Sequence, residues 1–297
     1  MKPIAVVTGA AGLIGQYFVK SASRWAPEWK VHGLTRTDLD LTDSSAVERT
    51  WQSIKPDLVI HCAALSRTKD CERDPQLARR INVEATAHLA HLSKDISFIF
   101  LSSGEVFDGR RGWYREEDEA IPINFYGKTK LEAEQLVLQN SRHTVVRIVL
   151  TAGTSQNGDR SFVEDMCRAA KSGKKVTLYS DEYRCPLPAG VIARAIWELA
   201  SKDTSGLYHL GGRERLSRWE IGQVLLPWYP ELQGHLVEGS ARSHTGAPRP
   251  VDLSLNYEKI QALLSFPIPG FRSWLKDRVH RGLDLWDYEP NLSEHKR

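Results

Sequence analysis

The stretch Thr8-Gly9-Ala10-Ala11-Gly12-Leu13-Ile14-Gly15, written TGAAGLIG, decides the fold of this 297-residue chain. It stands between an apolar run, Ile4–Thr8, and an amphipathic segment, Leu13–Arg24, which indicate a strand followed by a helix. Glycine permits a tight turn and lets backbone N–H groups approach a pyrophosphate, whose charge then faces the positive end of the helix. The spacing is GxxGxxG. It predicts a dinucleotide-binding turn with cofactor contacts at Gly9, Ala11, Gly12, Leu13, Ile14 and Gly15.

Short apolar runs alternate with longer amphipathic segments through the first half of the chain. The runs are rich in Val, Ile and Leu with little polar alternation, as in parallel strands that are buried on both faces. The predicted strands are Ile4–Thr8, Lys30–Thr35, Asp57–His61, Ser97–Leu101 and His143–Leu150, and the predicted helices are Leu13–Arg24, Ser44–Ile54, Pro75–Leu92 and Tyr126–Gln139. This alternation predicts an α/β fold with a doubly wound parallel sheet of the Rossmann type.

The pattern loosens after about residue 150. There the predicted helices are Phe162–Ser172, Ala189–Ala200, Ser217–Leu226, Tyr257–Leu264 and Phe271–Arg281, and the predicted strands are Lys175–Tyr179 and Gly206–Leu210. We expect residues 1–150 to form a dinucleotide-binding Rossmann domain. Residues 151–297 are expected to form a small α/β substrate region, interleaved with that domain, over the carboxyl ends of the strands. Ligands bind at that edge of open α/β sheets.

The composition limits the classes of partner. The net charge is +3 with both signs interleaved, so we expect neither a nucleic acid nor an anionic membrane as partner. The four cysteines show no CxxC pair and no zinc-like spacing, which favours free thiols in a reducing compartment. No run approaches the roughly 20 apolar residues of a membrane span, and no signal-peptide layout is visible, so the expected location is cytoplasmic. His88 and His91 lie three apart, but no third ligand accompanies them and no metal site is predicted.

The second predicted strand ends at Thr35-Arg36, where dinucleotide-binding folds contact the adenosine ribose. A basic residue there accommodates the 2′-phosphate of NADP(H), so Arg36 makes NADP(H) the favoured cofactor. Asp38 and Asp40 are close in sequence and are compatible with ribose hydroxyls, so NAD(H) stays open.

A tyrosine and a lysine open the fourth predicted helix, in Asn124-Phe-Tyr-Gly-Lys-Thr-Lys130. Tyr126 and Lys130 are four apart and therefore share a helix face. A lysine beside a phenol favours the phenolate, so Lys130 is expected to lower the pKa of Tyr126. Such a tyrosine can exchange a proton with a carbonyl oxygen while hydride moves between a nicotinamide and the carbonyl carbon.

At this point the sequence resembles the extended short-chain dehydrogenase/reductase family. The resemblance rests on TGAAGLIG, on His61-Cys62-Ala63-Ala64, on Ser103 and on Tyr126-Gly-Lys-Thr-Lys130. It implies that Ser103 orients the substrate carbonyl, that Tyr126 is the acid/base and that Lys130 binds the nicotinamide ribose. It further implies cofactor contacts at Thr35, Asp40, Leu41, Cys62, Ala63, Ala64, Ser66 and Asn82.

Within that family the chain is most similar to the dTDP-4-dehydrorhamnose reductases, on LDLTD (39–43), PDLVIHCAA (56–64), VFDG (106–109) and NFYGKTKLEAE (124–134). Those enzymes reduce the 4-keto group of a deoxysugar nucleotide with NAD(P)H, and their C-terminal region holds the diphosphate and base. The implied substrate contacts are Glu105, Val106, Phe107, Arg184 and Arg249. Trp113 is a further candidate because it lies in a glycine-flanked loop just past Ser103. The chain departs from the pattern after Ser103, where Gly104-Glu105 replaces an Asp-Tyr pair. The resemblance also implies a homodimer through the helices at Pro75–Leu92 and Tyr126–Gln139.

Two other functions stay open. An epimerase or dehydratase of the family keeps NAD bound and returns the hydride, although a dehydratase carries an Asp-Glu pair where this chain has Gly104-Glu105. The regulatory β subunit of methionine adenosyltransferase also resembles these reductases and binds another protein. Retention of Ser103, Tyr126 and Lys130 favours a reductase.

Overall fold

Six parallel strands form the central sheet of the computed structural model, which describes residues 2–280, 284, 286 and 287. The strand order is β10-β5-β4-β3-β1-β2. The strands are β1 (Ile4–Thr8), β2 (Lys30–Leu34), β3 (Leu58–His61), β4 (Ser97–Ser103), β5 (Thr144–Ile148) and β10 (Gly206–Leu210). The prediction of a doubly wound parallel sheet is confirmed, and β10 from the second half of the chain completes the sheet beside β5.

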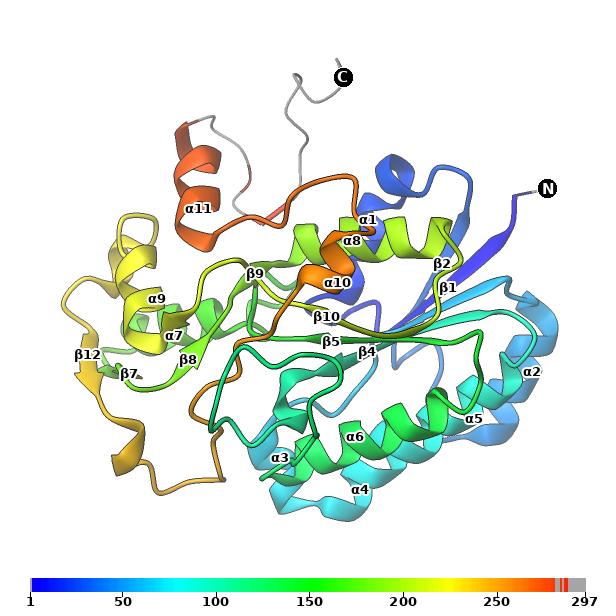
Figure 1. The fold of residues 1–297 in the computed structure, drawn as a ribbon, viewed down its shortest axis with the longest axis horizontal. Coiled ribbons are helices and arrows are strands. Elements are labelled where there is room, and N and C mark those ends of the chain that lie inside the picture. The colour runs from blue at the N-terminus through cyan, green and yellow to red at the C-terminus, as the bar shows by residue number, and fades with distance from the viewer. Residues whose placement is uncertain (1, 281–283, 285, 288–297) are drawn as a thin grey trace.

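Helices cover both faces of this sheet (Figure 1). One face carries α1 (Gly15–Trp25) and α8 (Ala189–Ser201), and the other carries α2 (Ser44–Ile54), α5 (Ala85–Leu92) and α6 (Phe125–Val137). Successive side chains of a strand point to opposite faces. Ala5 and Val7 accordingly join one apolar core and Val6 joins the other. This double burial explains why the strands are apolar throughout.

The predicted helix Pro75–Leu92 is interrupted. It consists of α4 (Pro75–Arg79), a π-helical turn η1 (Arg80–Glu84) and α5. A π turn inserts one residue into the helical repeat and often lies at a functional site. A short helix that the sequence pattern does not predict, α3 (Thr68–Arg73), precedes this segment. Its six residues are too few to show a helical period.

Several elements from the second half of the chain lie beyond the carboxyl ends of the strands, on the left of Figure 1. They include α7 (Phe162–Lys171), β7 (Val176–Tyr179), α9 (Arg218–Leu225) and β12 (Leu236–Gly239). The remaining elements are short. They are β6 (Thr151–Ala152), β8 (Tyr183–Arg184), β9 (Leu187–Pro188), β11 (Leu216–Ser217), α10 (Glu258–Gln261), η2 (Gly104–Val106), η3 (Pro230–Leu232) and η4 (Ala241–Ser243).

The C-terminal helix α11 spans Phe271–His280, and Arg281, with which its predicted range ends, lies outside the described residues. Within the part of the chain that the structure describes, no helix is both long and apolar enough to cross a membrane.

Candidate active site

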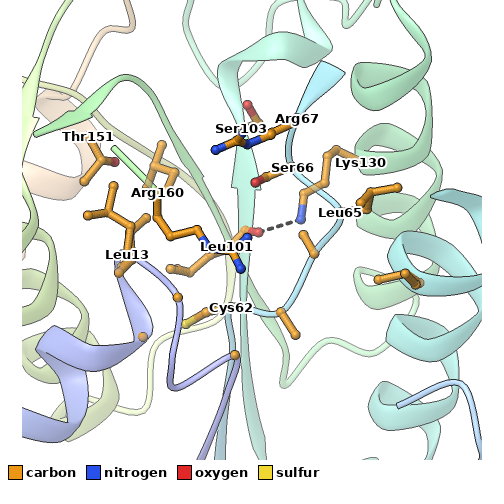
Figure 2. Close-up of a pocket in the computed structure, with 18 of the residues that line it drawn as sticks. Leu13, Cys62, Leu65, Ser66, Arg67, Leu101, Ser103, Lys130, Thr151 and Arg160 are labelled. Carbon is orange, nitrogen blue, oxygen red and sulfur yellow. Dashed lines mark hydrogen bonds between the residues drawn. The ribbon is translucent and has the colours of Figure 1, made fainter. Parts of the chain in front are cut away.

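A cavity of about 630 Å³ opens at the carboxyl ends of the sheet strands. It brings together residues that the sequence predicts for cofactor binding and for catalysis (Figure 2). Among the predicted residues, its wall includes Gly9, Ala11, Gly12, Leu13, Ile14, Gly15, Thr35, Arg36, Asp40, Leu41, Cys62, Ala63, Ala64, Ser66, Ser103, Glu105, Tyr126, Lys130 and Arg184. The glycine-rich turn and the tyrosine-lysine helix therefore face one continuous space.

The glycine-rich turn between β1 and α1 has the backbone shape of a phosphate cradle. Gly9 adopts a φ of +69°, and a Cβ there would lie 2.8 Å from the backbone nitrogen of Ala63. A Cβ at Gly15 would collide with the carbonyl of Gly9. Helix α1 begins with no capping side chain and no acid in its first turn, so no carboxylate of that turn offsets its positive end. This turn fits the diphosphate of a dinucleotide.

Two acidic side chains just after β2 accept hydrogen bonds from residues close to them in sequence. Asp38 Oδ2 accepts hydrogen bonds from the nitrogen and hydroxyl of Thr35 at 2.8 and 2.6 Å. Asp40 Oδ1 accepts from the nitrogen and hydroxyl of Thr42 at 2.9 and 2.8 Å. These bonds hold the pKa of both carboxyls below the ordinary value. Arg36 is exposed on the same rim, and its charge suits a phosphate.

The predicted catalytic residues meet at the end of β4. Lys130 Nζ donates to the Leu101 carbonyl oxygen at 2.7 Å (Figure 2). Burial lowers the pKa of Lys130 to about 7. Burial raises the pKa of Tyr126 and the charge of Glu105 adds to that rise, while a hydrogen bond with Ser103 opposes it. The expectation that Lys130 lowers the pKa of Tyr126 is therefore wrong for this structure, because both side chains are desolvated.

Asn124 ties Glu105 to the start of α6. Its Oδ1 accepts from the Gly127 nitrogen at 2.8 Å and so caps the helix, while its Nδ2 donates to Glu105 Oε2 at 2.7 Å. A Cβ at Gly127 would collide with the Glu105 carbonyl oxygen, so α6 starts in close contact with η2. The preference of asparagine for N-cap positions could have identified the capping role, but not the bond to Glu105.

Three arginines surround the buried carboxylate of Glu182. Glu182 Oε1 lies 3.0 Å from Arg184 Nη2 and 2.8 Å from Arg249 Nη2. Burial works to raise the pKa of Glu182, but Arg184 and then Arg249 outweigh it, with Arg218 adding to them, and the pKa lies below its ordinary value. Glu105 Oε1 lies farther away, 3.9 Å from Arg184 Nη2, so three guanidinium groups face two carboxylates and this arginine cluster, Arg184, Arg218 and Arg249, keeps a net positive charge.

The arginine cluster joins the large cavity to a second one of about 280 Å³. Arg184 lines the first, and Arg218 and Arg249 line the second. Apolar and aromatic residues of α7 and β7 complete the second wall: Phe162, Met166, Val176, Leu178 and Tyr179. An apolar and aromatic wall beside cations suits an aromatic base attached to phosphate.

Five predicted contacts lie away from the wall of the large cavity, and one of them, Arg249, lines the second cavity. Val106 and Phe107 are fully buried, and the Phe107 ring stacks on Tyr114 with centroids 4.1 Å apart. Trp113 is 43% exposed on the following loop. Asn82 is buried in the π turn.

The Asn82 side chain forms hydrogen bonds with the backbone of Leu65 and with the side chain of Thr129. Its Oδ1 accepts from the Leu65 nitrogen at 2.8 Å, and its Nδ2 donates to the Leu65 carbonyl at 3.1 Å and to the Thr129 hydroxyl at 3.0 Å. Leu65 lines the cavity and Thr129 belongs to α6. Asn82 therefore positions the loop after β3 against the helix that carries Tyr126 and Lys130.

No sequence motif identifies several residues of the cavity wall. Arg67 follows β3, Thr151 begins the two-residue strand β6, Arg160 and Ser161 lie in the loop before α7, and Phe162 begins α7. These positions lie in loops or at the ends of elements, so no fingerprint in the sequence marks them.

Comparisons with known proteins agree with this architecture. A family model described as RmlD substrate binding domain matches residues 2–283. A methionine adenosyltransferase 2 subunit beta from Xenopus laevis is 30% identical over 275 residues, which cover 87% of this chain and 82% of that protein. A dTDP-4-dehydrorhamnose reductase from Sinorhizobium fredii is 28% identical over 280 residues, covering 89% and 93%. The structure of a dTDP-4-dehydrorhamnose reductase from Bacillus anthracis in complex with NADP superposes with a TM-score of 0.85 at 24% identity, covering 95% of this chain and 100% of that one.

Proposed function

This chain belongs to the RmlD substrate binding domain family, and on that premise we propose that it is an NADP(H)-dependent reductase of a keto-deoxysugar nucleotide. The observation that carries the proposal is the shared cavity. Ser103, Tyr126 and Lys130 line the same space as the glycine-rich turn, at the carboxyl edge of the sheet.

A nicotinamide cofactor, when bound, supplies the hydride for the carbonyl carbon of the substrate. The cradle at Gly9–Gly15 fits its diphosphate, because added Cβ atoms would collide there with the backbone. Arg36 is the side chain that would hold a 2′-phosphate, and Lys130 would hold the nicotinamide ribose. The ratio of kcat/KM for NADPH and NADH measures this preference, and we expect it to favour NADPH.

The chain's own groups suit proton donation to a carbonyl oxygen. The raised pKa of Tyr126 keeps its phenol protonated near neutral pH, as a general acid requires. Ser103 offers a second hydroxyl on the same wall, where it would hydrogen-bond the carbonyl oxygen. Glu105 opposes loss of the Tyr126 proton, so the Gly104-Glu105 departure is compatible with the reducing direction.

The arginine cluster supports a nucleotide sugar as substrate. Arg184 faces the cavity of Tyr126, while Arg218 and Arg249 face the aromatic second cavity. A diphosphate placed at the cluster would direct a sugar toward Tyr126 and a base toward Tyr179. Arginine binds phosphate in a bidentate geometry, which favours this orientation.

The direct test is NADPH oxidation by the purified chain over a panel of 4-keto-deoxysugar nucleotides that differ in base and sugar. We expect turnover with at least one member. Binding of NADPH without turnover of any panel member would overturn the substrate assignment.

A second candidate function is a regulatory subunit, which the 30% identity to a methionine adenosyltransferase 2 subunit beta favours. Under this function the chain would coelute with a methionine adenosyltransferase catalytic chain in size-exclusion chromatography and would change its activity. Tyr126→Phe would leave both results unchanged. A reductase that needs the phenol predicts a large loss of turnover instead.

A further inference from the structure

Residues 154–161, the segment between β6 and α7, form a strap whose first end is fixed to the cofactor helix. Gln16 Nε2 on α1 donates to the Thr154 carbonyl oxygen at 2.7 Å. The Thr154 nitrogen donates to the Tyr17 hydroxyl at 3.1 Å. Gln16 is buried, so this end of the strap is held close against α1.

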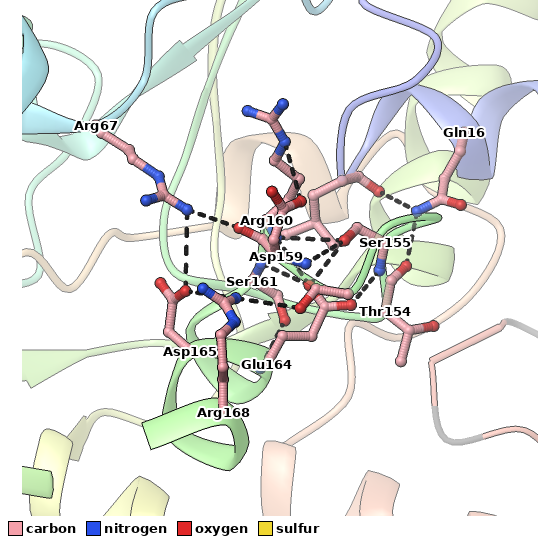
Figure 3. A network of polar contacts seen from close by, with 12 residues as sticks. Gln16, Arg67, Thr154, Ser155, Asp159, Arg160, Ser161, Glu164, Asp165 and Arg168 are labelled. Atoms are coloured by element: carbon pink, nitrogen blue, oxygen red, sulfur yellow. Dashed lines mark hydrogen bonds and ion pairs between the residues drawn. The ribbon is translucent and has the colours of Figure 1, made fainter. Parts of the chain in front are cut away.

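The other end of the strap is fixed across the cavity (Figure 3). Arg67, which follows β3, donates through Nη2 to the Asp159 carbonyl oxygen at 2.6 Å and lies 3.9 Å from Asp165 Oδ1. Arg168 donates to the Gly158 carbonyl oxygen at 3.1 Å. Gly12 and Arg67 both line the cavity, so the strap runs from the α1 side of the site to the side of the β3 loop.

Glu164 organises the strap from within. Its Oε2 accepts from the backbone nitrogens of Arg160 and Ser161 at 2.9 Å each and from the Ser155 hydroxyl at 2.8 Å. The Ser161 side chain in turn accepts a hydrogen bond from the Glu164 nitrogen, which completes a capping box at the start of α7. The backbone of Arg160 is therefore fixed independently of its side chain.

The Arg160 side chain extends from the strap into the cavity (Figure 2). It is 57% exposed, and its Nε lies 3.3 Å from Asp159 Oδ1 on the neighbouring residue. The same cavity is lined by Gly12 and Leu13, where the positive end of α1 has no acid in its first turn. The Arg160 guanidinium and the start of α1 therefore face the same space from different elements.

We propose that Arg160 is a strap-borne binding residue for the cofactor diphosphate, opposite the glycine-rich turn. This inference rests on the proposed function, because it takes the dinucleotide to occupy that turn. The diphosphate carries two negative charges, and a guanidinium can donate two parallel hydrogen bonds to phosphate oxygens. Arg67 Nη2 instead donates to the strap carbonyl of Asp159.

Ligands that carry or lack the diphosphate test this assignment. Dissociation constants are measured by NADPH fluorescence, with ADP-ribose and adenosine 2′-monophosphate as competitors. We expect Arg160→Gln to weaken NADPH and ADP-ribose about tenfold, the usual effect of losing a hydrogen bond to a charged group. Adenosine 2′-monophosphate lacks the diphosphate and should bind unchanged. Arg160→Lys, which keeps the charge but not the paired donors, should fall between wild type and Arg160→Gln.

Two further variants serve as controls. Arg36→Gln should show the reverse pattern and weaken NADPH and adenosine 2′-monophosphate while leaving ADP-ribose unchanged. Arg110→Gln removes an 89% exposed cation from another loop and should change none of the three.

Equal affinity of Arg160→Gln and wild type for NADPH and ADP-ribose overturns the inference and leaves the reductase proposal standing. A raised KM for the sugar nucleotide with unchanged cofactor affinity also overturns it and assigns Arg160 to the substrate. A wild-type chain that binds no nicotinamide dinucleotide overturns the proposed function itself. Melting temperatures of both Arg160 variants separate loss of a contact from loss of the strap.

Discussion

The proposed cofactor side and the proposed substrate side of the candidate site are held together by different forces. On the cofactor side, the eight residues Thr8–Gly15 form the glycine-rich turn, and backbone sterics set its shape, against Ala63 for Gly9 and against Gly9 for Gly15. On the substrate side, Glu182, Arg184, Arg218 and Arg249 come from separate segments and are joined by buried charge. We therefore expect added atoms to destabilise the first side and the removal of a charge to destabilise the second.

The largest effect is expected from removing the charge of Glu182. Glu182→Gln removes the nearer carboxylate of Arg184, which is buried, and leaves only Glu105 Oε1 at 3.9 Å from its Nη2. Breaking one partner of a buried pair should lower the free energy of unfolding by about 3 kcal/mol or more. Urea denaturation measures this, and the affinity for NADPH should not change. The control Glu117→Gln removes an acid from an exposed pair with Arg115 and should lower the free energy of unfolding by less than about 1 kcal/mol. Equal effects of the two variants would contradict the account.

Adding one methyl group to the glycine-rich turn is expected to have the next largest effect. Gly9→Ala must adopt a φ near +69° and also brings a Cβ to 2.8 Å from the Ala63 nitrogen. Gly173→Ala meets a similar φ of +74° with no atom within 4 Å, so it isolates the backbone strain. We expect Gly9→Ala to lower the free energy of unfolding by about 1–3 kcal/mol more than Gly173→Ala. Gly9→Ala alone should also lose NADPH binding in fluorescence titration. Retained binding would show that the turn is not the diphosphate site.

Mild acid should destabilise the sheet through its buried histidines, which belong to neither side of the site. Burial lowers the pKa of His61 and His209 to about 3. Below the ordinary value near 6.5 the unfolded chain binds protons that the folded chain does not, so stability is lost as pH falls from about 6.5 toward 3. Each histidine contributes a slope of about 1.4 kcal/mol per pH unit once the unfolded form is protonated. Urea unfolding at pH 7, 6 and 5 measures it, because carboxylates remain ionised over most of that interval. A flat profile would contradict the assigned burial.

The parts of the fold that the sequence predicts well are those whose own residues show an apolar or amphipathic pattern. The bounds of β1, α2 and β10 match their predicted ranges, Ile4–Thr8, Ser44–Ile54 and Gly206–Leu210. Each has an apolar or amphipathic period within its own residues. β12 has little such pattern in Leu236-Val-Glu-Gly239, and it exists because it pairs with β7, far away in sequence. Pairing of this kind is a tertiary property and leaves no local mark.

The same distinction applies to the active site. The glycine-rich turn and the pair Tyr126 and Lys130 are predictable because each lies within one short segment. The bond from Asn124 to Glu105 and the position of Arg160 depend on how loops meet. The pKa of Tyr126 depends on burial, which spacing in the sequence does not reveal.

The most direct test of the central claim is the turnover of Tyr126→Phe, measured as NADPH oxidation with the best keto-deoxysugar nucleotide of the panel. The account predicts a fall of about 10²–10⁴-fold, the usual contribution of general acid catalysis, with unchanged affinity for NADPH. A Tyr126→Phe variant that turns over like the wild type would contradict the assignment of this tyrosine as the proton donor.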